Sequence, residues 1–255
     1  MHTPDLLILM TLVACAAASA YWKKLTPAAA LTGINIGESV YIGDSYRGLA
    51  ELALFFLLAT AATAWKKNEK LAIKGNAAHQ PTRNTGQVIA NGGVAVILGI
   101  LAFVYPLHRD LYTLMLAASL SSATGDTLSS ELGMLYGRNH INILTGKPDE
   151  RGADGVISLE GLLIGLIGSA LIAIAWLALK SAAAPAMQTA IGPSAWHNLA
   201  RSAAIITLAG LLGNLADSIL GATLERKGWL SNDVVNFCNT GIAALCAGAL
   251  IGLTS

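Results

Sequence analysis

The chain has little charge for its length. Only 12% of its 255 residues are charged and 54% are hydrophobic, whereas soluble domains carry about 25% charged residues. The formal net charge is only +1, so the strong basic excess of a surface that binds nucleic-acid phosphates is missing. The composition therefore argues against a soluble domain and against a nucleic-acid partner, and it favours a protein that resides in a lipid bilayer.

Cysteine and histidine are also scarce, which bears on metal chemistry. The three cysteines lie within apolar runs without a Cys-x-x-Cys or Cys/His pair, as small core residues do. None of the five histidines has a partner at the spacing of a zinc site. A P-loop is excluded as well, because Gly146-Lys147 is followed by Pro148 where that motif requires Ser or Thr.

Hydrophobic segments of spanning length recur eight times. They cover residues 5–21, 27–43, 48–65, 87–105, 111–135, 155–179, 202–225 and 235–253. Each is close to the ~20 residues that a bilayer core requires. The second is the weakest, because Asn35, Gly37 and Glu38 interrupt it, and it is expected to be short or re-entrant. We therefore expect a single transmembrane domain over residues 1–255, an all-α polytopic transmembrane helix bundle of about eight helices.

Positive charges divide unequally between the loops that eight spans create. If the loop after the third span is cytoplasmic, twelve of the 16 Lys and Arg residues fall on the cytoplasmic side. The outer side keeps Arg47, Arg109, Lys180 and Arg201. This distribution follows the positive-inside rule, and it predicts a multi-pass protein of the inner or plasma membrane.

Two of the expected helices carry carboxylates into the apolar phase near their cytoplasmic ends. Asp126 and Glu131 follow a run of Ser, Thr and Gly in the fifth segment, and Asp217 and Glu225 occupy the seventh, so the two segments form a weak internal repeat. An unpaired charge at mid-bilayer costs at least about 2.5 kcal/mol on insertion scales. No Lys or Arg lies in either helix core to neutralise these acids. We expect a functional site, with polar helix-packing contacts as the alternative.

Carboxylates and hydroxyls without His or Cys favour a hard cation such as Mg²⁺. This ion binds through one or two carboxylates and keeps positions for water and substrate phosphates. A magnesium site on the cytoplasmic face therefore indicates a phosphate substrate.

Amide side chains near the same face are candidates for binding nucleotide or phosphate. Gln87 and Asn91 lie four residues apart, on one face of the fourth helix. Asn232 and Asn236 share a face in the same way at the start of the eighth helix. Asn232 alone would mean little, because Asn is an ordinary helix cap.

The loops of this face add glycines and positive charge. The segment that contains Asp154 and Gly155 precedes the sixth helix, and glycine lets backbone amides approach an anion, while a helix amino end attracts it. Arg83, Lys147 and Arg151 are candidates for neutralising the phosphate. Any cytoplasmic loop is basic, however, so their charge alone does not assign them a role.

Taken in order, these motifs resemble a known membrane family. They are Arg83 with Gly86-Gln87-Val88-Ile89-Ala90-Asn91-Gly92, Asp126-Thr127-Leu128-Ser129-Ser130-Glu131-Leu132-Gly133, Gly152-Ala153-Asp154-Gly155, Asp217-Ser218-Ile219-Leu220-Gly221-Ala222-Thr223, and Asn232 to Asn236. From about Lys24 to its end, the chain is similar to the integral membrane family that contains plant phytyl-phosphate kinase. A more distant likeness connects it to dolichol kinase and phosphatidate cytidylyltransferase. The family's usual Gly-Thr-Asp-Gly-Gly is Gly-Ala-Asp-Gly-Val here, and its paired Asn is Asn232-Asp233.

The resemblance implies a kinase that uses a nucleoside triphosphate, with CTP favoured, to convert an isoprenoid or long-chain alkyl monophosphate into the diphosphate. The catalytic residues would be Asp126, Asp217, Glu131 and Arg83. Asp126 and Asp217 would hold Mg²⁺, assisted by Glu131 and Glu225. Nucleotide and phosphate would be bound by Gln87, Asn91, Ser129, Ser130, Asp154, Gly155, Ser218, Asn232 and Asn236. A lipid monophosphate has a second pKa near ~6, so it is an oxyanion at neutral pH and needs no general base. Catalysis would consist of positioning and charge neutralisation.

Three alternatives stay open at this point. Carboxylates on two repeated membrane helices also describe a cation-coupled secondary transporter, although these polar residues crowd towards one face. The same site could transfer a cytidylyl group and form a CDP-lipid, and the motifs do not separate the two reactions. A non-catalytic membrane scaffold is the third alternative. The sequence also leaves open which lipid chain is accepted and whether the protein forms a homodimer.

Overall fold

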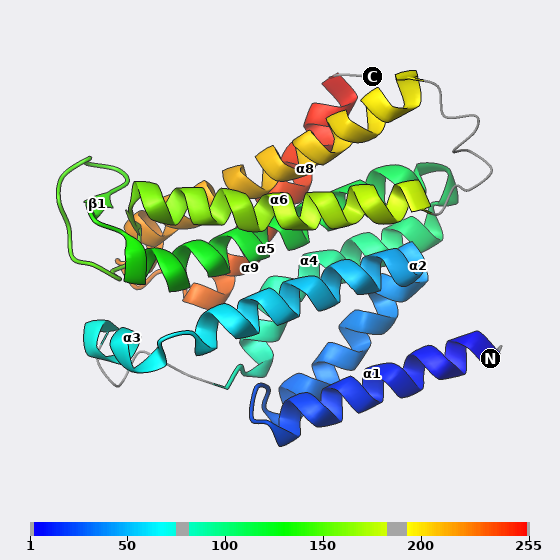
Figure 1. Ribbon diagram of the computed structural model, residues 1–255, viewed down its shortest axis with the longest axis horizontal. Coiled ribbons are helices and arrows are strands. Elements are labelled where there is room, and N and C mark those ends of the chain that lie inside the picture. Colours follow the sequence, from blue (N-terminus) through cyan, green and yellow to red (C-terminus); the bar gives the residue numbers. More distant parts are fainter. Residues whose placement is uncertain (1–2, 75–81, 183–192, 254–255) are drawn as a thin grey trace.

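The computed structural model describes residues 3–74, 82–182 and 193–253, and within them the chain is almost entirely helical (Figure 1). Its elements are α1 (Thr3–Tyr21), α2 (Pro27–Ala64), α3 (Lys67–Lys74), α4 (Thr85–Val104), η1 (Pro106–His108), α5 (Arg109–Tyr136), β1 (Ile141–Asn142), β2 (Val156–Ile157), α6 (Leu159–Ala182), α8 (Pro193–Leu220), η2 (Gly221–Glu225) and α9 (Asn232–Leu253). Among the described residues, five helices are long and apolar enough to cross a membrane: α2, α4, α6, α8 with η2, and α9. The predicted all-α polytopic bundle is confirmed.

Helix α2 contains two of the eight predicted segments. As a straight helix its 38 residues would extend about 57 Å, nearly twice the ~30 Å of a bilayer core. The helix breaks at Ser45, where φ is 59° and ψ is −146°, and the chain turns back there (Figure 1). By contrast, the polar residues that interrupt the first arm leave it helical. Asn35, for example, donates from Nδ2 to the carbonyl oxygen of Leu31 over 3.0 Å.

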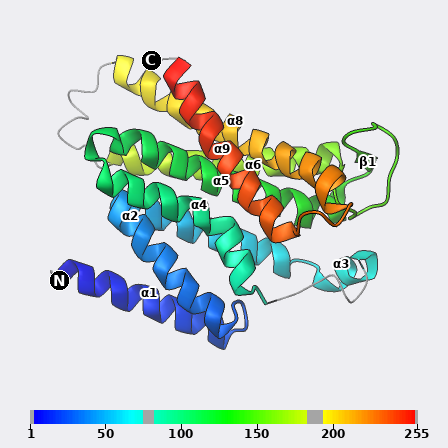
Figure 2. The ribbon, with the colours of Figure 1, turned by 180° about the vertical axis from the view of Figure 1, so that it is seen from behind.

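Helix α5 lies at the centre of the bundle and contacts α2, α4, α6, α8 and α9 (Figures 1 and 2). It is not among the helices that qualify as membrane spans, because Ser, Thr and acidic residues lower its hydropathy. Its neighbours shield it from lipid and accept its hydrogen bonds. Ser121 Oγ, for example, donates to the carbonyl oxygens of Ser169 at 3.1 Å and Ile206 at 3.2 Å. The central position therefore explains how a polar helix is tolerated in a membrane protein.

The apolar core forms two large clusters that share α5. The first joins α2 and α4 to α5 through Val40, Leu98 and Leu116, among others. The second joins α6, α8 and α9 to α5 through residues such as Trp176 and Ile206. Because both clusters contain residues of α5, this helix is packed on two sides. The packing fixes the position of its C-terminal part, which carries Asp126 and Glu131.

The connections that carry most of the positive charge lie at one end of the bundle. These are the α1–α2 loop, the segment around α3, the β1–β2 hairpin and the turn between η2 and α9 (Figure 1). In the hairpin, Ile141 pairs with Ile157 and Asn142 with Val156 in antiparallel register. The hairpin was not predicted: the sixth segment was expected to begin at residue 155, but α6 begins at Leu159.

Candidate active site

A cavity of about 280 Å³ opens at the charged end of the bundle. Its lining comes from α2, α4, α5, α6, α8, α9 and the hairpin. All the residues to which the family resemblance assigned a catalytic, metal-binding or nucleotide-binding role line this one space: Arg83, Gln87, Asn91, Asp126, Ser129, Ser130, Glu131, Asp154, Gly155, Asp217, Ser218, Glu225, Asn232 and Asn236. The fold thus brings together residues that are up to 153 positions apart in the chain. The role of each remains a prediction.

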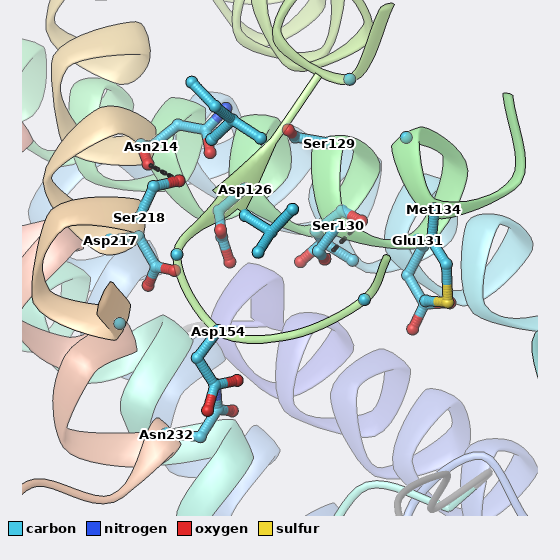
Figure 3. Close-up of a pocket in the computed structure, with 18 of the residues that line it drawn as sticks. Asp126, Ser129, Ser130, Glu131, Met134, Asp154, Asn214, Asp217, Ser218 and Asn232 are labelled. Atoms are coloured by element: carbon cyan, nitrogen blue, oxygen red, sulfur yellow. Dashed lines mark hydrogen bonds between the residues drawn. The ribbon is translucent and has the colours of Figure 1, made fainter. Parts of the chain in front are cut away.

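Asp126 of α5 and Asp217 of α8 are at the centre of the cavity lining. Their carboxyl groups are close enough to interact directly, and Figure 3 shows both pointing into the same space. Asn239 fixes Asp217 by donating from Nδ2 to Oδ1 over 2.7 Å. Ser122 Oγ in turn donates to Asn239 Oδ1 over 3.1 Å. Three helices therefore set the position of the Asp217 carboxylate.

Asn239 belongs to a row of asparagines on α9 that the sequence reasoning recognised only in part. Asn236 donates from Nδ2 to Asn232 Oδ1 over 3.2 Å, and Asn239 donates to Asn236 Oδ1 over 3.5 Å. Their spacing of four and then three residues puts all three on one helical face. The same spacing rule, extended by one turn, would have identified Asn239 from the sequence.

Glu131 has a basic partner that the sequence reasoning missed. Lys70 of α3 is fully buried, and its Nζ lies 2.6 Å from Glu131 Oε2. Thr63 adds a weak hydrogen bond from Oγ1 to Glu131 Oε1 over 3.5 Å. The sequence shows no Lys or Arg within the cores of the two acid-bearing helices, and the cation that pairs with Glu131 lies outside them. Lys70 comes from a short separate helix, so inspection of the α5 and α8 sequences could not identify it. A metal ion bound at Glu131 would compete with Lys70 for the Glu131 carboxylate.

The start of α4 fixes two of the predicted ligand-binding amides. Asn84 Oδ1 accepts from the backbone N of Gln87 over 2.9 Å, and Gln87 Oε1 accepts from the backbone N of Asn84 over 3.1 Å, which is a capping box. Asn91 donates from Nδ2 to the carbonyl oxygen of Gln87 over 2.8 Å. Gln87 therefore keeps its amide nitrogen for a ligand, and Asn91 keeps its oxygen.

Arg83 lies directly before this helix and is held by its backbone. It donates to the carbonyl oxygen of Lys24 and accepts from the backbone N of Thr26, both over 3.0 Å. Its guanidinium carbon lies 5.9 Å from the centroid of the Phe55 ring. Burial lowers the pKa of Arg83, and the charge of Glu131 raises it, but a guanidinium stays protonated at neutral pH. The cavity therefore contains a permanent positive charge.

The β1–β2 hairpin places Asp154 at the mouth of the cavity. Arg226, just beyond η2, donates from Nε to the carbonyl oxygen of Asp154 over 2.6 Å, and its other end lies 2.8 Å from Asp149 Oδ2. A hydrogen bond from Asn142, with further ones from the Glu150 backbone and Arg226, lowers the pKa of Asp149. The Asp149–Arg226 pair is therefore charged at neutral pH and ties the hairpin to α8.

Replacing Gly155 with alanine is expected to lift the hairpin from the cavity. Gly155 has a φ of 71°, and an added Cβ would lie 2.3 Å from the Cβ of Ala222 and 2.5 Å from its backbone N. Because these atoms belong to η2, they cannot yield without moving the helix. We expect Gly155→Ala to lower the catalytic rate about tenfold or more, by displacing Asp154, and to expose the hairpin to limited proteolysis.

Gly146 at the tip of the hairpin is the matched control. Its φ of 65° imposes the same backbone strain on alanine, but an added Cβ has nothing within 4 Å. Equal effects of Gly146→Ala and Gly155→Ala on rate and proteolysis would show that contact with η2 is unimportant.

Two other basic residues considered for phosphate binding do not line the cavity. Arg151 donates to the carbonyl oxygens of Met134 and Leu135, the latter over 2.8 Å, so it caps the end of α5. Lys147 is exposed in the hairpin. Among the described lining residues, Arg83 is the one Lys or Arg, and it faces five acids: Asp126, Glu131, Asp154, Asp217 and Glu225.

This donor set fits a magnesium ion completed by its substrate. No three of the described His, Cys, Asp and Glu residues converge into a preformed metal centre. Asp126 and Asp217 supply two carboxylates, which is the number that Mg²⁺ takes from the protein where water and phosphates complete its octahedron. A phosphate entering a lining so rich in acids requires a bound cation to offset the repulsion.

Comparison with known proteins gives one family. Residues 10–244 match the family described as integral membrane protein DUF92. Protein VTE6, chloroplastic, of Arabidopsis thaliana is 32% identical over 206 residues, which cover 78% of this chain and 57% of VTE6. The chain thus spans little more than half the length of that relative. The uncharacterized membrane protein MJ0933 of Methanocaldococcus jannaschii is 31% identical over 208 residues, or 82% of this chain and 76% of that protein.

A cyanobacterial relative covers more of the chain. The uncharacterized membrane protein sll0875 of Synechocystis is 29% identical over 247 residues, which are 94% of this chain and 88% of that protein. No solved structure matches the chain significantly. The resemblance that the sequence motifs indicated, to an integral membrane family of the phytyl-phosphate kinase type, is confirmed.

Proposed function

This chain belongs to the DUF92 family of integral membrane proteins, and we propose that it transfers a phosphoryl group from a nucleoside triphosphate to an isoprenoid or long-chain alkyl monophosphate. The products are the lipid diphosphate and a nucleoside diphosphate, and CTP is the favoured donor. The observation that carries the proposal is the meeting of Asp126 and Asp217, from separate helices, in a polar cavity at one end of a membrane bundle. The similarity to VTE6 supports the class of substrate.

The lining residues divide into metal ligands and groups that bind phosphate. Asp126 and Asp217 would hold Mg²⁺, which when bound supplies charge neutralisation to the transferring phosphoryl group. Ser130 and Ser218 donate their hydroxyl hydrogens to the carbonyl oxygens of Thr127 and Asn214, so their oxygens are left as acceptors suited to metal-bound water. Arg83 and the Gln87 amide nitrogen are donors for the phosphates of the nucleotide.

The reaction needs positioning more than proton transfer. An oxygen of the lipid monophosphate attacks the γ-phosphorus, the bond from that phosphorus to the β–γ bridging oxygen breaks, and its electron pair leaves with the nucleoside diphosphate. Because the attacking oxygen is already ionised at neutral pH, no lining residue has to accept a proton. Holding the two phosphates in line is then the main contribution of the cavity.

The distribution of charge supports a cytoplasmic position for this cavity. The loops and helix ends on the cavity side hold twelve of the 16 Lys and Arg residues, and such an excess marks the cytoplasmic side of a membrane protein. Nucleotides are present on that side. The lipid chain can stay in the bilayer while its phosphate enters the cavity from the headgroup level.

A substrate panel tests the proposal. The protein purified in detergent would be offered CTP, ATP, GTP or UTP with Mg²⁺ and phytyl, geranylgeranyl or longer prenyl monophosphates. We expect mass spectrometry to find equal amounts of lipid diphosphate and nucleoside diphosphate, and we expect EDTA to stop the reaction and Mg²⁺ to restore it. A CDP-lipid with pyrophosphate would establish cytidylyl transfer instead. Cation flux into liposomes without nucleotide turnover would establish transport.

A further inference from the structure

Lys70 of α3 is fully buried at the cavity end of the bundle (Figure 1), although it is not one of the residues that line the cavity. Its ammonium group donates to the carbonyl oxygens of Ala62 over 2.5 Å and Thr63 over 3.5 Å, and to Glu131 Oε2 over 2.6 Å. Ala62 and Thr63 lie in the last turn of α2, and the carboxyl end of a helix stabilises a positive charge. The end of α2 therefore fixes the position of the Lys70 ammonium group.

Glu131 connects this buried lysine to the cavity. One of its carboxylate oxygens binds Lys70, and its side chain lines the cavity together with Arg83. Burial lowers the pKa of Arg83 and the charge of Glu131 raises it, so Glu131 interacts with both bases. In the view of Figure 3, Asp126 lies between Glu131 and Asp217. Lys70, Glu131 and Arg83 therefore form a charge cluster beside the proposed metal site.

The net charge of this cluster depends on Lys70. Arg83 and Glu131 alone would be neutral as a pair, and a carboxylate beside a guanidinium weakens the attraction of that guanidinium for an anion. With Lys70 the cluster carries a net positive charge. The cavity lining contains four further acids, all of which repel phosphate. A polyphosphate therefore binds more favourably if the charge of Glu131 is neutralised from outside the cavity.

We propose that Lys70 is a positioning residue for nucleotide binding: it holds the Glu131 carboxylate and neutralises its charge, which leaves the charge of Arg83 available to the phosphates of the nucleotide. This inference rests on the proposed function. In this role Glu131 belongs to the phosphate-binding part of the cavity, and it is not a ligand of the metal ion.

Equilibrium dialysis of CTP at a fixed Mg²⁺ concentration, without a lipid acceptor, tests the proposal apart from turnover. We expect Lys70→Met to raise the Kd of CTP about tenfold, because the cluster loses one unit of positive charge. Adding Glu131→Gln to Lys70→Met makes the cluster positive again, so the Kd should return to within about threefold of the wild-type value. If Lys70→Met binds CTP as the wild type does, or if the double variant binds as weakly as Lys70→Met, the proposal is overturned.

Glu131→Gln alone distinguishes the charge cluster from a metal ligand. Lys70 and Arg83 both keep their charges in this variant, and Lys70 keeps its two carbonyl partners on α2. We expect the Kd of CTP to stay the same or fall, and the Mg²⁺ concentration for half-maximal binding to be unchanged. Weaker CTP binding with a higher Mg²⁺ requirement would identify Glu131 as a metal ligand and overturn the proposal. This variant decides the question even if Lys70→Met does not fold.

Two control variants separate charge from stability. Lys66→Met removes the same charge from a side chain that is 41% exposed and pairs with Glu69, so solvent screening should limit the change in Kd to less than about twofold. Ile172→Ala opens a cavity in the fully buried core of α6, which should lower the unfolding temperature and leave the Kd unchanged. If Ile172→Ala weakens CTP binding as much as Lys70→Met does, Lys70 acts through stability alone and the assignment is wrong.

Binding and turnover can fail separately. If the wild type converts no lipid phosphate, the proposed function fails, and the Kd values of CTP still decide the role of Lys70. If CTP does not bind, inorganic pyrophosphate with Mg²⁺ replaces it as the probe for the same set of variants. Absence of binding of both probes to the wild type would show that the cavity does not bind polyphosphate, and it would refute the inference.

Discussion

Replacing Asp126 or Asp217 with asparagine is expected to lower the rate of phosphoryl transfer by at least about a hundredfold to a thousandfold, the range seen when one preorganised electrostatic contact is removed from an active site. Each substitution removes the charge of one proposed metal ligand and keeps the side-chain volume. The apparent Mg²⁺ concentration for half-maximal rate should rise in parallel. Initial rates over a Mg²⁺ titration measure both effects.

The fold should survive these substitutions, because asparagine has the volume of aspartate and can still hydrogen-bond to the facing carboxyl group. The unfolding temperature in detergent is therefore expected to stay the same or rise. Asp110→Asn is the matched control on the same helix: Asp110 lies at the opposite end of α5, is 88% exposed and pairs with Lys180 at 2.6 Å. Full activity in either Asp126→Asn or Asp217→Asn would refute the metal assignment.

Replacing Lys70 with methionine is expected to destabilise the protein by about 3 kcal/mol. The side chain of Lys70 is fully buried, and its ammonium group lies 2.6 Å from Glu131. The substitution keeps the apolar stem and leaves the Glu131 carboxylate without its cation, and breaking a buried pair in this way costs about 3–5 kcal/mol. The lower end applies because the side chain of Glu131 is 20% exposed. Denaturant or thermal unfolding in detergent measures the change.

Two companions make the experiment specific to the ion pair. Lys66 lies just before the same short helix, is 41% exposed and pairs with Glu69 at 3.1 Å, so Lys66→Met should cost less than about 1 kcal/mol. Adding Glu131→Gln to Lys70→Met should restore part of the lost stability. If the losses for Lys70→Met and Lys66→Met are equal, the buried pair does not stabilise the fold.

The sequence predicted the parts of the fold that depend on local composition. Apolar length located α4, α6, α8 and α9, and the excess of basic residues assigned their ends to one side. The cavity could be predicted because the acids that form it, such as Asp126 and Asp217, are conspicuous within apolar segments. Even the polar helix α5 was found, since its hydroxyl and carboxyl residues are interspersed with enough Leu and Ala to mark a helix.

The rest depended on contacts that no local pattern records. The Lys70–Glu131 pair joins residues 61 positions apart, and Lys70 follows two lysines, Lys66 and Lys67, that are exposed. The amide nitrogen of Asn214 on α8 has no hydrogen-bond partner among the described residues and lies beside Gly165 of α6. This contact between two helices cannot be derived from the sequence of either one. The hairpin depends on Gly152 and Gly155, which adopt positive φ. The glycines in the sequence allow such a turn, but they do not specify the shape of the hairpin.

The reversal at Ser45 determines on which face of the membrane the rest of the chain emerges. A continuous helix from Pro27 to Ala64 would cross the bilayer once, and every later connection would then exit on the opposite face. Two crossings return the chain to its starting face, so that α3, the hairpin and the turn before α9 lie on the same side as the α1–α2 loop. The side of the membrane on which the proposed active site opens, relative to the α1–α2 loop, thus depends on the backbone of Ser45, a residue that does not line the cavity.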